Sequence, residues 1–142
     1  MQKIWFKDHS IEEINLIFET YMTGYLGIKA TEIHDDMLVV SMPITDRVRQ
    51  PFGILHGGAS VVLAESAGSV ASNLVVDDEK YAGVGMEVNA NHLRSISDGT
   101  LFAYCTPLHL GQKSHVWDIK IKDEKEVLIC VSRLTVAVIE KK

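Results

Sequence analysis

Residues 50–76 read QPFGILHGGASVVLAESAGSVASNLVV, a glycine-containing loop that continues directly into a long apolar stretch. From residue 59 to residue 76 the stretch is apolar on nearly every side, and its only charged side chain is Glu65. A helix without an ordinary polar stripe has to be covered almost completely, so we expect a sheet to curl around it. Burial of an unpaired carboxylate is costly, and Glu65 is therefore a candidate functional residue.

The residues near the start of the chain predict a first helix, at 10–22. Ser10 and Glu13 have the spacing of a capping box, and Gly24 lies just beyond the expected end. The apolar residues expected on one face of this helix are Ile14, Ile17, Phe18 and Tyr21.

Strand-like patterns account for most of the remaining sequence. Two strands, at 29–34 and 37–44, are expected to form a hairpin, and an irregular loop at 45–55 leads from them into the long helix. Four more strands are expected at 83–93, 100–108, 114–122 and 127–139. Six strands and one long helix predict an α+β fold, with a six-stranded, mainly antiparallel sheet wrapped around a central helix in a single domain of residues 1–142.

The strand expected at 114–122 shows the clearest pattern, because apolar and polar positions alternate along it. The residues expected on its buried face are His115, Trp117, Ile119 and Ile121. Cys105 and Cys130 each lie in an apolar strand-like segment, which predicts buried, reduced thiols rather than a disulfide.

The overall charge and the N-terminus limit the classes of partner. A formal net charge of -5 disfavours a general nucleic-acid surface, which depends on Lys and Arg to neutralise phosphates. The N-terminus lacks the apolar core of a signal peptide, and the segment 59–76 lacks basic or aromatic anchors at both ends. We therefore expect a cytoplasmic protein that binds neither nucleic acid nor membrane.

The start of the long helix has the parts of an active site. His56, Gly57 and Gly58 place free backbone N–H groups at the positive end of the helix dipole, where an anion or an oxyanion is stabilised. Glu65 follows about two turns inside the same helix, and Ser69 shares its face at four-residue spacing. An oxyanion hole with a carboxylate base or nucleophile is the interpretation that these residues favour.

This loop and helix resemble the signature of the hotdog-fold acyl-CoA thioesterases, Gln-x-x-Gly-x-x-His-Gly-Gly followed by a helical glutamate. The signature begins here at Gln50, reaches His56, Gly57 and Gly58, and is completed by Glu65. The segments VNANHLRS at 88–95 and PLHLG at 107–111 also resemble the family, so that the similarity covers nearly the whole chain. It is strongest to the branch that hydrolyses 1,4-dihydroxy-2-naphthoyl-CoA in menaquinone synthesis, and next to the branch that clears misloaded aryl carrier protein in enterobactin synthesis.

The resemblance implies a role for each matching residue. Glu65 would attack the thioester carbonyl or activate a water, and the Gly57 N–H would polarise the carbonyl oxygen. Gln50 would help to hold the thioester, and His56 would orient the backbone of the oxyanion hole. The residues expected to contact the water, the acyl group or coenzyme A are Ser69, Val70, His92, Phe52, Leu55, Arg94, Ser95, His109 and Gly111, with Lys113 as a further candidate for the phosphates.

The resemblance also implies a homodimer with a continuous sheet, and commonly a tetramer built as a dimer of dimers. In that assembly Gln50, His56 and Gly57 of one subunit would face Glu65 and Ser69 of the other. No cofactor is expected. A metal site is not expected either, because the histidines lack paired zinc-ligand spacing and no acidic cluster joins them.

Several alternatives stay open on the sequence. Glu65 could be a core carboxylate paired with Arg47, Arg49 or Arg94, and Ser69 could bond back to a helical carbonyl. The substrate could be an acyl or aryl carrier protein instead of a CoA thioester. Two different classes are a hotdog hydroxyacyl dehydratase and a non-catalytic acyl-CoA sensor, because a fold does not determine its function.

Overall fold

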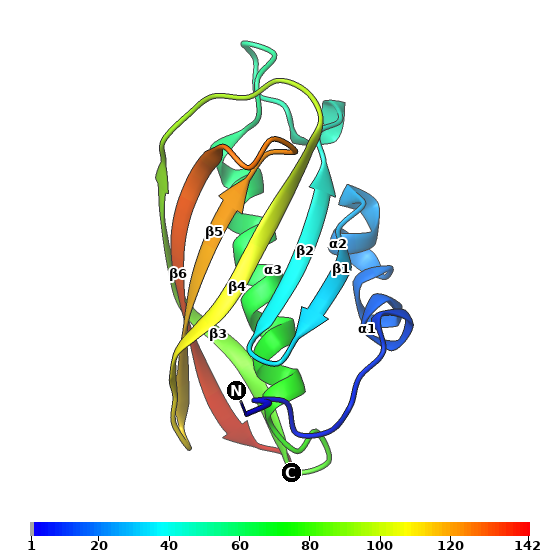
Figure 1. The fold of residues 1–142 in the computed structure, drawn as a ribbon, viewed down its shortest axis with the longest axis vertical. Coiled ribbons are helices and arrows are strands. Elements are labelled where there is room, and N and C mark those ends of the chain that lie inside the picture. The colour runs from blue at the N-terminus through cyan, green and yellow to red at the C-terminus, as the bar shows by residue number, and fades with distance from the viewer. Residues whose placement is uncertain (1) are drawn as a thin grey trace.

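The long helix α3, Gly57–Val75, lies in the centre of the molecule and the sheet curls around it (Figure 1). The computed structural model describes residues 2–142. Its six strands pair in the order β1-β2-β4-β5-β6-β3, and every pair is antiparallel. The strands are β1 Lys29–His34, β2 Met37–Pro43, β3 Tyr81–His92, β4 Thr100–Leu110, β5 Ser114–Lys122 and β6 Leu128–Glu140. The predicted α+β architecture of one sheet around one helix is confirmed.

Small residues on α3 let the sheet approach the helix closely. Ala64, Ala67 and Ala71 are fully buried, and Gly68 lies between them. A Cβ atom added at Gly68 would come within 2.4 Å of Leu134 Cδ2 on β6, so a larger residue would push the sheet away. The alanine and glycine face of α3 thus determines how tightly the sheet wraps the helix.

The covering of α3 is less complete than the sequence predicts. Glu65, expected to be buried, is exposed in the single chain, and the side of the helix around it is only half-buried. The sheet ends at the edge strand β3, and the side of the helix beside this strand, which carries Glu65, is left open. Val84 and Met86, on that edge strand, are 51% and 66% exposed.

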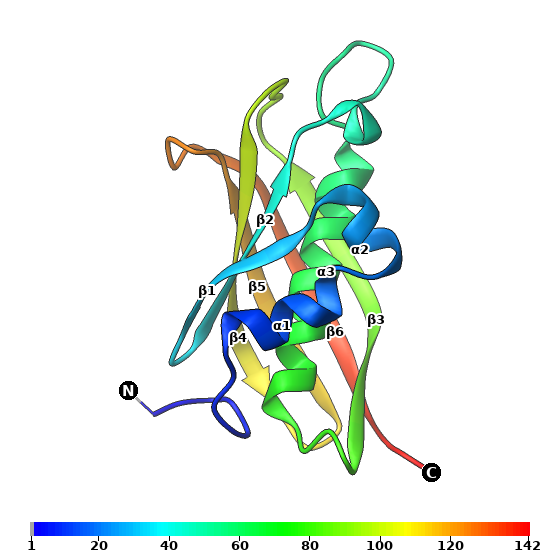
Figure 2. The same cartoon turned by 90° about the vertical axis from the view of Figure 1, so that its right-hand side faces the viewer.

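The first predicted helix is in fact two short helices, α1 Ile11–Phe18 and α2 Tyr21–Leu26, which lie beside β1 and α3 (Figure 2). The predicted cap is confirmed, because the Ser10 side chain accepts a hydrogen bond from the Glu13 N–H at 3.1 Å. The continuous helix to residue 22 is wrong. Gly24 lies inside α2 rather than beyond the helix end. The backbone of the preceding turn is so close that a Cβ at this position would come within 2.1 Å of the Glu19 carbonyl oxygen.

This break changes which side chains of the first segment are buried. Ile14 and Phe18 are buried as predicted, at 1% exposure each. Ile17 and Tyr21, placed on the same face by helical periodicity, are 51% and 93% exposed instead. Tyr21 has a φ of 53°, so the chain changes direction there and the period of the pattern is lost.

The strand predictions agree with the structure to within two residues at most ends. The strand at 114–122 has the predicted bounds and its alternation is confirmed, with Trp117 fully buried. β4 runs on to Leu110, because an irregularity between Pro107 and His109 carries the strand past the proline. Cys105 and Cys130 are buried and unpaired, as expected.

A buried polar network joins α3 to β5 away from the loop that precedes the helix. The Trp117 indole N–H donates to Ser72 Oγ at 2.7 Å, and Ser72 Oγ lies 2.8 Å from His115 Nδ1. The Ser72 oxygen has two lone pairs, so it can accept from the indole and either donate to His115 Nδ1 or accept from it. We assign a neutral imidazole to His115 because the ring is buried. Burial, with a smaller effect of nearby His109, lowers the pKa of His115 below its usual range.

We expect this histidine to make stability depend on pH. A pKa that is lower in the folded state means that the unfolded chain binds the proton more readily, so the contribution of His115 is present above about pH 6.5 and is lost as the pH falls through and below that value. Urea unfolding at pH 7.5 and pH 5.5 measures the effect: the free energy of unfolding should fall less for His115→Gln than for the wild type. Equal pH dependence of the two proteins would contradict the assignment.

Candidate active site

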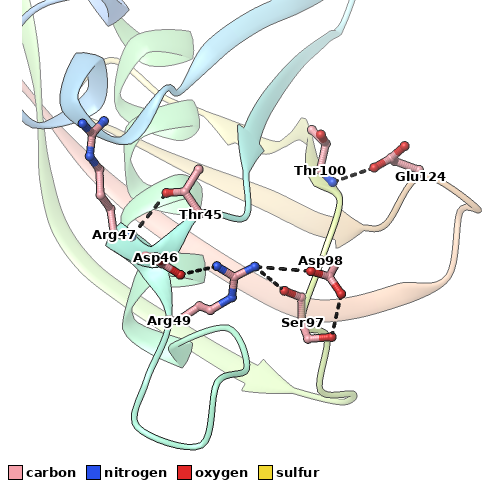
Figure 3. A network of polar contacts seen from close by, with 8 residues as sticks. All are labelled: Thr45, Asp46, Arg47, Arg49, Ser97, Asp98, Thr100 and Glu124. Atoms are coloured by element: carbon pink, nitrogen blue, oxygen red, sulfur yellow. Dashed lines mark hydrogen bonds and ion pairs between the residues drawn. The ribbon is translucent and has the colours of Figure 1, made fainter.

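The loop between β2 and α3 is held to the loop between β3 and β4 by Arg49 (Figure 3). The Arg49 guanidinium pairs with Asp46 at 2.6 Å and with Asp98 at 3.3 Å, and it donates to the Ser97 carbonyl at 2.9 Å. Backbone bonds reinforce the contact, since the Leu55 N–H donates to the Ile96 carbonyl at 2.8 Å. Two loops far apart in the sequence are thereby joined beside the start of α3.

His56 is the N-cap of α3, as its place in the sequence predicts. Its Nδ1 accepts a hydrogen bond from the Gly58 N–H at 2.8 Å, so we assign the ring proton to Nε2. The His56 N–H donates to the Val48 carbonyl at 2.8 Å, and the Ala59 N–H donates to the His56 carbonyl at 3.0 Å. Among residues 2–142, no acceptor takes the N–H of Gly57. That N–H is free at the positive end of the helix dipole.

A cavity of about 290 Å³ opens beside this N–H. Of the residues predicted for the site, it brings together Leu55, Gly57, His92, Arg94 and Ser95. The other residues that line it are Ile54, Ser60, Leu93, Ile96 and Ile129. The walls are therefore mainly apolar, with a few polar groups near the helix start and the loop, which is the usual character of a small-molecule site.

His92 lies against the first residue of α3. It is the last residue of β3, and its Nε2 is 2.8 Å from the position that a Cβ on Gly57 would take. A side chain at position 57 would therefore have to displace the imidazole. No side-chain hydrogen bond holds the His92 ring within the described residues, so the imidazole is available to a ligand in the cavity.

Glu65 and Ser69 lie further along α3, on its open side. The Glu65 carboxylate lies against β3 at Gly85, where an added Cβ would come within 2.5 Å of Glu65 Oε2. In the described part of the chain, Glu65 has no ion pair and no side-chain hydrogen bond. Arg49 pairs with aspartates, and the Arg47 guanidinium stacks on the Tyr25 ring at 4.2 Å. The alternative of a paired core carboxylate is therefore wrong for this chain.

The remaining predicted residues are distributed over two places. Gln50 and Phe52 lie in the turn before α3, where the Gln50 side-chain carbonyl accepts from the Phe52 N–H and the Phe52 ring is 90% exposed. Val70 is half-buried on α3, next to Ser69.

His109, Gly111 and Lys113 lie at the opposite end of the molecule, where β4 turns into β5 (Figure 1). Gly111 and Lys113 line a second cavity of about 870 Å³ there. Within one chain, these residues do not meet the residues around Gly57.

Sequence reasoning missed Gly85, and it also missed the other residues that line the cavity, Ser60 and Ile129 among them. Gly85 leaves the space beside β3 that the Glu65 carboxylate occupies. An isolated glycine in a strand pattern is a signal of close approach, and this signal could have identified Gly85. Ser60 and Ile129 line the cavity, but nothing in their local sequence distinguishes them from core residues.

The part of the chain that the structure describes holds no group of three or more metal-ligating side chains close together. The same part contains no helix that is both long and apolar enough to cross a membrane. The apolar stretch predicted as a core helix, 59–76, is packed in the core as α3.

Comparison with known proteins agrees with this geometry. A model of the thioesterase superfamily matches residues 52–130. The 1,4-dihydroxy-2-naphthoyl-CoA hydrolase of Escherichia coli (strain K12) is 50% identical over 136 residues, which are 96% of this chain and 99% of that protein. The proofreading thioesterase EntH of Cronobacter sakazakii (strain ATCC BAA-894) is 43% identical over 136 residues, 96% of this chain and 98% of that protein.

A solved structure gives the same result for the fold. The crystal structure of a mutant of thioesterase PA1618 from Pseudomonas aeruginosa has a TM-score of 0.95 at 44% identity, covering 98% of this chain and 100% of that one. The chain belongs to the thioesterase superfamily and has its hotdog fold. The protein is thus an enzyme that acts on thioesters.

The contact between Gly85 and Glu65 can be tested by substitution. Gly85→Ala should displace the carboxylate, and because a shift of about 1 Å in a reacting group can reduce turnover about 100-fold, kcat should fall by that order. Gly83→Ala is the matched control, since its added Cβ would meet Ser72, Val136 and Asn73 but not Glu65. Thiol release from an aryl-CoA thioester measures both variants. Equal activity of the two would show that Gly85 does not position Glu65.

Proposed function

We propose that this enzyme hydrolyses aryl-CoA thioesters, such as 1,4-dihydroxy-2-naphthoyl-CoA, to the free acid and coenzyme A. The free Gly57 N–H beside an apolar cavity is the observation that carries the proposal. It is the donor that a thioester carbonyl needs when negative charge develops on its oxygen. The Escherichia coli relative, a 1,4-dihydroxy-2-naphthoyl-CoA hydrolase, supports an aromatic acyl group, and the Cronobacter relative, a proofreading thioesterase, supports thioester hydrolysis.

The Glu65 carboxylate and the Gly57 N–H can carry out this hydrolysis by either of two routes. Glu65 either takes a proton from a water that attacks the carbonyl carbon, or attacks that carbon itself and is then released by water. Both routes place negative charge on the carbonyl oxygen, next to the Gly57 N–H. Removal of one such donor typically raises the barrier by about 3 to 4 kcal/mol. When the tetrahedral intermediate collapses, the C–S bond breaks and the thiolate of coenzyme A leaves. In the first route it takes up the proton held by Glu65. In the second route a mixed anhydride with Glu65 forms, and the water that hydrolyses it releases Glu65 and supplies the proton.

The site requires two subunits. Glu65 is eight residues after Gly57, so helix geometry separates the two by about 12 Å along the axis. One carbonyl cannot contact both groups of the same chain. The exposed edge strand β3, with Val84 and Met86 on its surface, offers a pairing edge for a second copy. We propose a homodimer, and a tetramer of two such dimers, in which Gln50, His56 and Gly57 of one subunit face Glu65 and Ser69 of the other.

The cavity suits the acyl end of the proposed substrate, and two exposed basic side chains suit its coenzyme A end. Apolar walls such as Leu55, Ile96 and Ile129 suit a compact acyl group, with Val70 and His92 as further contacts. Arg94 and Lys113 are exposed and have no ion pair among the described residues, although the net charge of the chain is -5. Positive groups of this kind are needed for the phosphates of coenzyme A. Ser95 lies beside Arg94 at the cavity, whereas His109 and Gly111 lie near Lys113 and would come from another subunit.

Substitution of the carboxylate tests the reaction. Glu65→Gln should lower kcat by about 1,000-fold, because a positioned base or nucleophile contributes 10²–10⁴ and the amide cannot act as either. Glu79→Gln, in the exposed turn after α3, is the control and should keep full activity. Thiol release from benzoyl-CoA, 1,4-dihydroxy-2-naphthoyl-CoA, fatty acyl-CoA and aryl carrier protein provides the assay. Tight binding without turnover by the wild type would indicate a sensor, and a preference for the carrier protein would indicate proofreading.

Mixing two inactive variants tests the shared site. In a heterodimer of Glu65→Gln and His56→Ala chains, one of the two sites receives His56 from the first chain and Glu65 from the second and is intact. Random exchange of subunits should therefore restore about a quarter of the wild-type activity. No recovery after verified subunit exchange would contradict a site built from two chains.

A further inference from the structure

Ser60 stands apart from the other buried serines of the protein. Ser41, Ser60, Ser72 and Ser132 are each 2% exposed or less. Ser132 Oγ donates to the Asn89 carbonyl at 2.7 Å, Ser41 Oγ donates to the Lys29 carbonyl at 3.4 Å, and Ser72 bonds to His115 and Trp117. The hydroxyl of Ser60 has no hydrogen-bond partner among residues 2–142.

The usual local partner does not satisfy Ser60. A serine inside a helix generally bonds back to the carbonyl four residues earlier, which here is that of His56. That carbonyl accepts from the Ala59 N–H at 3.0 Å, and Ser60 Oγ makes no hydrogen bond to it. Alanines occupy other buried positions of α3, including Ala64 and Ala67, so packing alone does not call for a hydroxyl at position 60. A buried hydroxyl without a partner destabilises the fold, which points to a partner supplied from outside the chain.

The cavity beside Gly57 is the place from which that partner would come. Ser60 lines this cavity together with Gly57 and His92. Its hydroxyl turns about a single torsion, so a ligand in the cavity can be reached from the buried wall. The other cavity walls nearby, Leu55 and Ile129 among them, offer no side-chain hydrogen bond.

We propose that Ser60 is a specificity-determining residue that binds a hydroxyl group on the acyl ring, at the position next to the thioester. This inference rests on the proposed aryl-CoA hydrolysis. Ser60 is three residues after Gly57, a neighbour on the helix surface displaced by about 4.5 Å along the axis. When the Gly57 N–H holds the carbonyl oxygen, a substituent on the adjacent ring carbon is the one that comes closest to Ser60. The relative from Escherichia coli is named for a substrate with a hydroxyl at carbon 1, beside the thioester at carbon 2.

The test compares three CoA thioesters: benzoyl, 2-hydroxybenzoyl and 4-hydroxybenzoyl. In the wild type, kcat/KM should favour the 2-hydroxybenzoyl thioester over the other two. In Ser60→Ala this selectivity ratio should fall about three- to tenfold, the effect of one hydrogen bond. Ser132→Ala, which removes a buried serine that has an internal partner, should leave the ratio at its wild-type value.

Thermal unfolding without ligand gives an independent measurement. Ser60→Ala should keep or raise the Tm, because it removes an unsatisfied group, whereas Ser132→Ala should lower it. An unchanged selectivity ratio in Ser60→Ala, or a fall in its Tm like that of Ser132→Ala, would overturn the role of Ser60. If the wild type cleaves no aryl thioester at all, the proposed function fails, and this inference fails with it.

Discussion

The hydrogen bond from the Gly58 N–H to His56 Nδ1 fixes where α3 begins, and the rest of the site depends on that position. Because the cap takes the second N–H of the helix, the first, on Gly57, remains free. Arg49 holds the loop on one side of this helix start, and the small residues of α3 hold the sheet on the other. A donor fixed in this way needs no reorganisation when charge develops on a bound carbonyl.

The same helix is the reason for the proposal that two chains share the site. A rigid helix keeps Gly57 and Glu65 about 12 Å apart along its axis, and no side-chain movement closes that gap. The open side of α3, where Glu65 is exposed, and the unpaired edge of β3 lie together. We infer that dimer formation and completion of the site are one event. The turn at Gly111 and Lys113, distant from Gly57 in the same chain, would then reach the site of a neighbouring subunit.

The fold and the helix start could be predicted from local patterns, and long-range features could not. The apolar stretch around Glu65 and the alternation around Trp117 depend only on neighbouring residues, and both give elements that the structure contains. The break between α1 and α2 lies at Tyr21, whose positive φ is not registered by the periodicity of the apolar residues. Exposure of Glu65 depends on what the sheet leaves uncovered, and the unsatisfied hydroxyl of Ser60 depends on which groups pack around it. Local sequence patterns record neither.

A crystal structure with a ketone analogue of an aryl-CoA substrate tests the central claim most directly. In this analogue a methylene group separates the carbonyl from sulfur, so it binds without being hydrolysed. We predict that its carbonyl oxygen accepts a hydrogen bond from the Gly57 N–H of one subunit, while the Glu65 carboxylate of the other subunit approaches the carbonyl carbon. A carbonyl bound away from Gly57, or beside a Glu65 of the same chain, would contradict this account.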